Sequence, residues 1–240
     1  MMKKLFFLSA FVFLFTTVFA QGPWSVGGKL GINFTNISGE YSSSVNTDHN
    51  WITTPLFGAV ALYSFSDLVA VSAELNLAKS GTLINLTFVG SNGGEEKGSY
   101  KEKFTSIQIP ILARFTFGET WQFFAYGGFY WSYILGGKYE AKSDSFDQSG
   151  KIKFGDAPDN YTGDDIYLDK DYNRRMDIGL NVGGGVQRQL GPGKLVLDLR
   201  FGMGFLDFNK FPDDNKPDGY KSFLNRSLNL SLAYIFNLGN

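Results

Sequence analysis

The stretch from Met176 to Phe205 constrains the fold of this chain more than any other part of it. On either side of Gly191-Pro192-Gly193, apolar residues alternate with small, polar or charged ones. A side-chain period of two indicates extended strands, and the Gly-Pro-Gly break between them indicates a hairpin. Strands in soluble domains cluster near ~5–6 residues, whereas a strand that crosses a membrane needs ~9–11 residues tilted by roughly 45°. The pattern therefore predicts a membrane-spanning hairpin.

The same alternation recurs along the chain and predicts eight strands in all. They cover approximately residues 24–34, 56–65, 69–78, 106–117, 121–135, 176–190, 194–205 and 223–236. Whether the third continues past Gly81 to Phe88, with a change of phase, stays open. Pro110 predicts a bulge or bend in the fourth, because it removes a ladder hydrogen bond. The facing of the second and fifth also stays open, since each is apolar on both faces.

The connections between these strands alternate between long and short. Short turns at 66–67, 118–120 and 191–193 share one end, and long polar segments at 35–53, 90–103, 136–175 and 207–222 share the other. This asymmetry is typical of outer-membrane barrels, which have short periplasmic turns and long extracellular loops. We therefore expect an all-β, eight-stranded, antiparallel up-and-down transmembrane β-barrel. Aromatic residues at the short-turn end predict a periplasmic girdle: Trp24, Tyr63, Phe65, Phe117, Trp121, Tyr234 and Phe236.

Residues 1–20 have the features of a secretory signal peptide, with a barrel domain following at 21–240. Lys3 and Lys4 precede an apolar run, and Val18-Phe19-Ala20 offers a cleavage site before Gln21. The alternative is an uncleaved anchor helix, for which the run is short of the ~20 residues required. Cleavage would remove two positive charges from a formal net charge of −1, leaving −3, which argues against a nucleic-acid partner. The chain has no cysteine, which excludes disulfides and thiolate chemistry.

The strand phase places six charged residues inside the barrel: Lys29, Glu74, Arg114, Asp177, Asp198 and Arg200. Three are positive and three are negative, which predicts paired charges, since an unpaired buried charge costs several kcal/mol. We interpret them as a structural network that plugs the lumen, with a proton or ion path as the alternative. Eight strands leave an interior just wide enough for side chains, so a diffusive channel is disfavoured. In a secreted soluble barrel, a further alternative, these charges would instead face solvent.

His49, the only histidine, lies in the first long polar segment. Ser43, Ser44 and Asp48 nearby supply the other residue types of a hydrolase or acyltransferase site. No spacing fixes their arrangement, and polar loops commonly contain such residues. We therefore expect no enzyme activity and no cofactor, and keep a lipid-modifying enzyme that uses His49 as an alternative.

Two of the long polar segments are rich in aspartate. Oxygen clusters of this kind bind calcium, but Asp214-x-Lys216-x-Asp218-Gly219 has a lysine where an oxygen ligand is needed. Solvated loops are the expectation, and their tyrosines are an alternative contact surface. Arg226, on the lipid-facing phase near the outer rim, could reach lipopolysaccharide phosphate, and Arg188 lies near the periplasmic rim. The aspartates are Asp144, Asp147, Asp156, Asp159, Asp164, Asp165, Asp169, Asp171, Asp213, Asp214 and Asp218.

Five motifs give the chain a family resemblance over nearly all of residues 24–236. They are Gly28-Lys29-Leu30-Gly31-Ile32-Asn33, Ala73-Glu74-Leu75 before Lys79-Ser80-Gly81, Ile107-Gln108-Ile109-Pro110, Leu197-Asp198-Leu199-Arg200-Phe201 and the closing Tyr234-Ile235-Phe236. The chain resembles the PorT-like outer-membrane β-barrel proteins of Bacteroidetes. The resemblance implies an eight-stranded barrel in the outer membrane and little about activity. One departure is that Asn237-Leu238-Gly239-Asn240 follow the terminal aromatic residue.

These observations predict a non-enzymatic integral outer-membrane protein with a plugged polar lumen. It would act through its external loops or as part of an envelope or secretion-related assembly. Its expected partners are outer-membrane lipid, lipopolysaccharide and an envelope protein. A small porin-like channel is the remaining alternative.

Overall fold

The computed structural model describes residues 24–40, 46–89, 94–143, 146–159, 163, 165–169, 171–210, 216 and 219–238. The signal peptide expected at 1–20 lies outside them. In the described ranges no helix is long and apolar enough to cross a membrane. The strands there are β1 (Trp24–Glu40), β2 (Asn46–Asn50), β3 (Ile52–Ser64), β4 (Val69–Val89), β5 (Glu95–Phe117), β6 (Gln122–Ser143), β7 (Asp147–Phe154), β8 (Ile166–Leu168), β9 (Met176–Leu190), β10 (Gly193–Gly204) and β11 (Lys221–Asn237).

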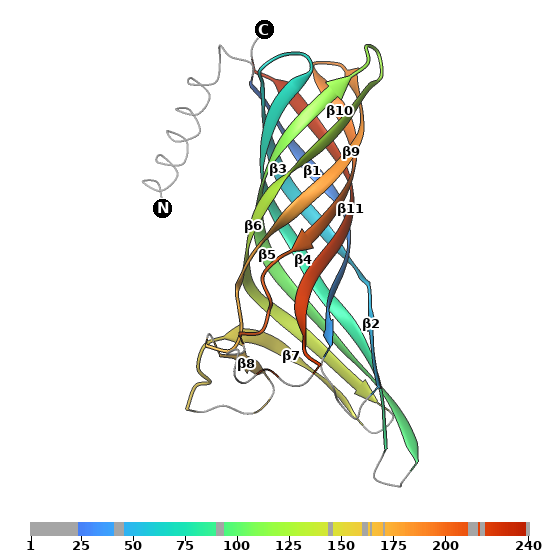
Figure 1. The fold of residues 1–240 in the computed structure, drawn as a ribbon, viewed down its shortest axis with the longest axis vertical. Helices are drawn as coiled ribbons and strands as arrows, with labels where there is room; N and C mark the ends of the chain where they lie inside the picture. The colour runs from blue at the N-terminus through green and yellow to red at the C-terminus, as the bar shows by residue number, and fades with distance from the viewer. Residues whose placement is uncertain are drawn as a thin grey trace, which may run out of the picture.

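Eight of these strands form a closed ring of hydrogen-bonded neighbours (Figure 1). The order around the ring is β1, β3, β4, β5, β6, β9, β10 and β11, and every neighbouring pair is antiparallel. β1 closes the ring on β11, with Ser25 opposite Asn237 at one end and, after a register shift beyond Ser38, Glu40 opposite Lys221 at the other. The predicted eight-stranded, up-and-down barrel is therefore confirmed.

The two ends of the barrel differ as the connection lengths predicted. The turns after β3, β5 and β9 lie at one end together with the last residues of β11, at the top of Figure 1. The last of them is a two-residue turn, since Leu190 pairs directly with Gly193. Its first residue, Gly191, has a φ of 61°, a left-handed conformation that glycine adopts without strain. The opposite, extracellular end carries the long connections and further strands.

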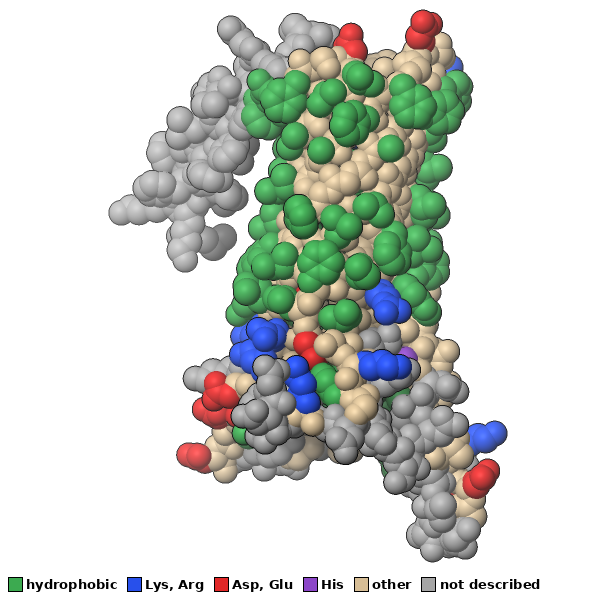
Figure 2. Space-filling view, viewed as in Figure 1, with side chains coloured by type: hydrophobic (Ala, Val, Ile, Leu, Met, Phe, Trp, Pro, Cys, Tyr) green, Lys and Arg blue, Asp and Glu red, His purple; other side chains and the backbone are tan. Residues whose placement is uncertain are grey.

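Alternation along the strands gives the barrel an apolar outside and a largely polar inside. On β10, Leu197 and Leu199 are 46 % and 52 % exposed, whereas Asp198 and Arg200 are buried. Figure 2 shows apolar side chains gathered around the barrel wall, with charged side chains towards its two ends. An exposed apolar band of this extent is expected where lipid, rather than water, surrounds the wall.

The structure also decides the facing of the two strands that are apolar on both faces. In β3, Leu56 and Val60 are buried inside, whereas Phe57 faces outward. In β6, Tyr126 is buried and Phe129 faces outward. The same inward phase in β6 carries Phe124, Tyr130, Ser132 and Ile134.

The aromatic residues that point inward from β6 fit because the neighbouring strand carries glycine opposite them. Tyr126 pairs with Gly183, and Phe124 and Tyr130 pair with Gly185 and Gly179. A Cβ on Gly183 would clash with the backbone carbonyl oxygen of Leu199 and lie 2.6 Å from the Tyr126 hydroxyl oxygen. Glycine therefore leaves the space that these rings occupy across the strand pair.

We expect Gly183→Ala to destabilise the barrel by about 1–3 kcal/mol, because the added methyl group displaces the Tyr126 ring or the backbone beside it. Gly28→Ala is the matched control, since a Cβ at Gly28 meets nothing within 4 Å. Urea unfolding of both variants, refolded into lipid vesicles, measures the difference. Equal losses for the two variants would show that the ring contact has no energetic role.

Three of the long segments expected to be irregular contain strand. β1 continues to Glu40 and β2 pairs with β4, so the segment 35–53 is largely extended. β5 begins at Glu95 within the segment 90–103, and β4 continues past Gly81 to Val89. The change of phase considered there does not occur, because Ala78, Ser80 and Thr82 all stay buried in one unshifted register with β5. In the segment 136–175, β6 runs on to Ser143, β7 pairs with it, and β8 pairs with β7 in parallel. The expectation of irregular loops was wrong there. A strand that lies outside the lipid can keep its backbone hydrogen bonds to its neighbours without an apolar face, so its sequence shows no alternation of apolar and polar residues.

The bulge or bend expected at Pro110 is not seen as a register shift. Pro110 pairs with Tyr130 of β6 in an unshifted register, and the shift between these strands lies instead at Thr105 and Ser106. Towards β4, paired residues stop at Ala73 opposite Ile111 and resume at Asn76 opposite Gln108. Because proline has no N–H to donate, the β4–β5 pairing is interrupted beside Pro110. The register of β5 does not shift at this position.

Candidate functional site

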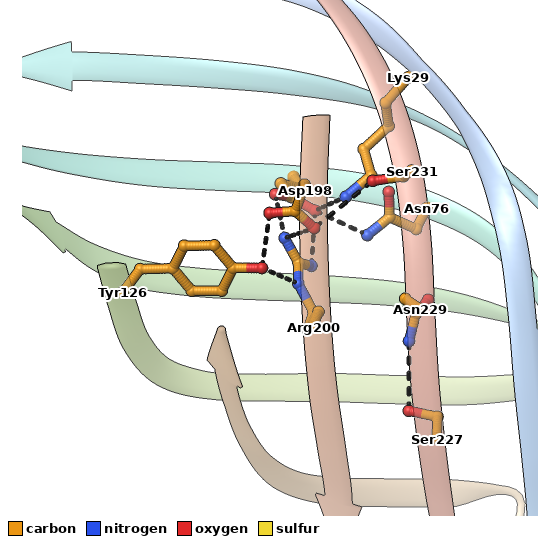
Figure 3. A network of polar contacts seen from close by, with 9 residues as sticks. Lys29, Asn76, Tyr126, Asp198, Arg200, Ser227, Asn229 and Ser231 are labelled. Atoms are coloured by element: carbon orange, nitrogen blue, oxygen red, sulfur yellow. Dashed lines mark hydrogen bonds and ion pairs between the residues drawn. The ribbon is translucent and has the colours of Figure 1, made fainter. Parts of the chain in front are cut away.

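The strand phase brings four of the six predicted lumen charges into one buried network (Figure 3). Glu74 of β4 lies at its centre. Lys29 Nζ of β1 donates to Glu74 Oε2 at 2.9 Å. Arg200 of β10 donates from Nη1 to Oε2 at 2.9 Å and from Nη2 to Oε1 at 2.8 Å. One carboxylate thus binds two cations, and its bond to Arg200 is bidentate, the strongest geometry for such a pair.

Tyr126 connects the second carboxylate to the same network. Its hydroxyl donates to Asp198 Oδ2 at 2.6 Å and accepts from Arg200 Nε at 2.9 Å. Asn76 Nδ2 donates to Glu74 Oε2 at 3.0 Å, and Ser231 Oγ donates to Asp198 Oδ1 at 3.4 Å. The sequence reasoning missed Tyr126, Asn76 and Ser231 because it selected lumen residues by charge. All three residues occupy inward-facing positions in the alternation of their strands, and selecting lumen residues by this phase would have identified them.

The other two predicted lumen charges lie apart from this network. Arg114 Nη2 donates to Gln187 Oε1, and its guanidinium lies 3.7 Å from the centre of the Phe124 ring. Asp177 Oδ2 accepts from the Tyr130 hydroxyl at 2.7 Å. In the described part of the chain Arg114 and Asp177 form no ion pair, so the expectation that all six charges are paired was wrong for these two. Neutral hydrogen-bond partners and an aromatic face take the place of a counter-ion.

Side chains fill the lumen at the network and on both sides of it. The cavity beside Glu74 and Arg200 has a volume of about 30 Å³, and another of about 30 Å³ lies beside Asp177, so each has room for only a water or two. An apolar cluster lies towards the periplasmic end and a second towards the outer end. The first comprises Val60, Leu112, Phe124, Tyr126, Val196, Ala233 and Ile235, and the second Ile37, Phe104, Ile134, Tyr139 and Ile152.

The aromatic residues predicted for the periplasmic girdle lie around the short-turn end. Tyr63 makes edge contacts with both Trp24 and Phe65, each at 4.9 Å between ring centres. Tyr234 and Phe236 make a similar contact at 4.8 Å. Phe117 stacks on Phe123, and Arg188 lies over the Trp121 ring. Their role at the membrane interface stays a prediction.

His49 lies in β2, on the extracellular side of the apolar band. Its ring makes an edge contact with Phe223 at 6.0 Å. Ser43, Ser44 and the side chain of Asp48 lie outside what the structure describes. The described residues therefore show no serine or carboxylate arranged with His49 for catalysis.

The aspartate-rich segments are described only in part, since Asp144, Asp164, Asp213, Asp214 and Asp218 lie outside the described residues. Among the residues that are described, no group of three or more acidic, histidine or cysteine side chains could hold a metal ion. Asp165 instead pairs with Lys153 at 2.6 Å. A calcium site in these segments stays an untested prediction.

A closed ring of eight antiparallel strands with an apolar outer band and a filled polar lumen defines a small transmembrane β-barrel. The family comparison makes the assignment specific: the chain belongs to the outer membrane protein beta-barrel domain family, whose model matches residues 19–209. The predicted location in the bacterial outer membrane is thereby confirmed.

Solved structures similar to this chain are also small barrels, at low identity. The outer membrane protein OprG from Pseudomonas aeruginosa is 12 % identical, with 91 % of this chain and 97 % of that chain covered and a TM-score of 0.43. Neisserial surface protein A is 12 % identical, with 90 % and 97 % covered and a TM-score of 0.41. Ail of Yersinia pestis is 14 % identical, with 90 % and 99 % covered and a TM-score of 0.35. No curated protein matches the chain significantly. The fold therefore rests on the strand ring and the family match.

Proposed function

We propose that this protein is a non-enzymatic outer-membrane barrel that presents a rigid extracellular platform to another envelope or surface protein. The platform consists of the strand continuations beyond the apolar band, which are residues 82–89 of β4, 95–102 of β5, 138–143 of β6, and β7. Figure 1 shows these strands projecting well beyond the barrel wall. This projection is the observation that carries the proposal.

Backbone pairing holds the platform in one shape. Val89 pairs with Glu95 near the tip of the β4–β5 hairpin. β6 pairs with β5 up to Ser143 and with β7 up to Lys142. Lys97, Lys142 and Lys151 on it are exposed. A paired sheet loses less conformational entropy on binding than a flexible loop does, which favours specific recognition.

The proposal includes the finer resemblance to PorT-like proteins of Bacteroidetes, and with it a place in a secretion-related assembly. It also includes lipopolysaccharide as a lipid partner. Arg226 supports the latter, because it is exposed on the outer wall of β11 beside the apolar band. An arginine in that position can reach a phosphate while its aliphatic part stays against lipid.

Site-specific photo-cross-linking in intact native cells tests the platform. We expect a protein adduct from a photoreactive residue at Lys97 or Lys151 on the platform, and none from Glu119 in a periplasmic turn. The Glu119 position is the matched control, since it is equally exposed at the opposite end of the barrel. Recovery of the bare barrel from all three positions would overturn the proposal. An adduct from Glu119 alone would place the contact in the periplasm and would also contradict it.

A filled lumen gives a second expected result. In planar lipid bilayers the refolded protein should show no discrete conductance steps, because an ion would have to displace the Glu74 network and both apolar clusters. A control barrel of known conductance, incorporated in the same preparation, excludes failed insertion. Reproducible steps at low voltage would instead support the channel alternative.

A further inference from the structure

The extracellular mouth of the barrel contains a cavity far larger than the spaces in the lumen. Its volume is about 420 Å³, against about 30 Å³ beside the Glu74 network. It lies inside the ring formed by the outer parts of β1, β4, β5 and β11, with β2 beside it. Ligand pockets for small molecules begin at roughly 300 Å³, so the cavity is large enough to hold one. We call this space the vestibule.

The walls of the vestibule are mainly apolar and aromatic. Phe104 is 1 % exposed and belongs to the outer apolar cluster, so it closes the floor towards the lumen. Phe208 lies 5.3 Å from it between ring centres, and Phe223 contacts the His49 ring. Tyr100 adds a fourth aromatic residue to the lining. These rings can enclose an apolar body and, through their faces, attract a cation.

One charged side chain in this largely apolar lining favours a ligand that carries a positive charge. Among the described residues that line the vestibule, Glu102 alone has a formal charge at pH 7. Burial raises the pKa of Glu102, which a hydrogen bond from Tyr100 partly opposes. A carboxylate in such surroundings gains most from a cation placed beside it.

We propose that the vestibule binds a small organic amine with an apolar body, whose ammonium group pairs with Glu102 and whose body packs between Phe104, Phe208 and Phe223. A carboxylate ligand would be repelled by Glu102. A neutral apolar ligand would leave Glu102 without a counter-ion, and a bare metal ion would gain nothing from the aromatic walls. This site goes beyond the proposed contact function, since it lies inside the mouth and not on the outward surface of the platform.

The test compares two fluorinated probes of nearly equal size, 2-(4-fluorophenyl)ethylamine and 2-(4-fluorophenyl)ethanol. Each is titrated into the full chain in lipid nanodiscs, and binding is followed by ¹⁹F NMR, with empty nanodiscs as the blank. We expect the amine to bind the protein above the blank and about tenfold or more tightly than the alcohol, since only the amine forms a charge-assisted bond.

Matched variants locate the binding. Glu102→Gln should weaken amine binding about tenfold and leave the alcohol unchanged. Glu140→Gln is the control, because Glu140 pairs with Lys103 at 3.3 Å and does not line the vestibule. Thermal unfolding of each variant establishes that it is folded. Equal binding of amine and alcohol, or equal effects of Glu102→Gln and Glu140→Gln, would overturn the proposal.

Discussion

Replacing Glu74 with glutamine is expected to destabilise the barrel by about 3–5 kcal/mol, the largest effect of any single polar substitution considered for this chain. Glu74 is buried and binds both Lys29 and Arg200. The amide keeps the shape of the carboxylate but removes its charge, so two buried cations lose their shared counter-ion. Urea unfolding of the protein refolded into lipid vesicles measures the loss in free energy of unfolding.

An exposed ion pair supplies the control for this prediction. Glu140 pairs with Lys103 on the outer part of the sheet, where the two side chains are 45 % and 34 % exposed, so Glu140→Gln should cost about 0–1 kcal/mol. Adding Lys29→Met to Glu74→Gln removes one of the two stranded cations and should recover part of the loss, as a double-mutant cycle would show. Similar losses for Glu74→Gln and Glu140→Gln would contradict the central role given to Glu74.

The second large effect is expected on the outer wall of the barrel. Leu199 is 52 % exposed midway along β10, so it faces the centre of the membrane. Leu199→Arg should cost about 2–4 kcal/mol in lipid vesicles, because a charged side chain at that depth leaves water for hydrocarbon.

Leu195 on the same strand is the matched control. It lies beside the Gly191-Pro192 turn and pairs with Tyr234 and Arg188, within the region predicted as the aromatic girdle. Leu195→Arg should therefore cost about 0–1 kcal/mol, since the arginine can reach the interface. If Leu199→Arg were neutral or stabilising, the apolar band would face water, as it would in a secreted soluble barrel.

The amino-acid sequence by itself determined the barrel and the side of its wall on which most residues lie. A period of two is a local property of an extended chain, so Leu197, Asp198, Leu199 and Arg200 report their facing without knowledge of any partner. The same reasoning placed Lys29 and Glu74 inside and located the short turns. It failed at the outer end, where three of the segments expected to be loops, 35–53, 90–103 and 136–175, contain strand. Polar strands carry no period-two signal once both faces leave lipid, and their pairing depends on the neighbouring strands.

Only the tertiary structure decided which charges meet. Glu74 and Arg200 are 126 residues apart, and their bidentate bond depends on the register of every strand around the closed ring. That register also pairs Arg114 with Gln187 and Asp177 with Tyr130. In the sequence, Arg114 and Asp177 have the same inward phase as Glu74 and Arg200, so the phase alone does not distinguish the two kinds of partner. The vestibule beside Glu102 has the same origin, since it is the space left inside the ring when β4 and β5 continue beyond the membrane. Facing follows from local geometry, whereas partners and cavities follow from ring closure, a long-range property that no single stretch of sequence contains.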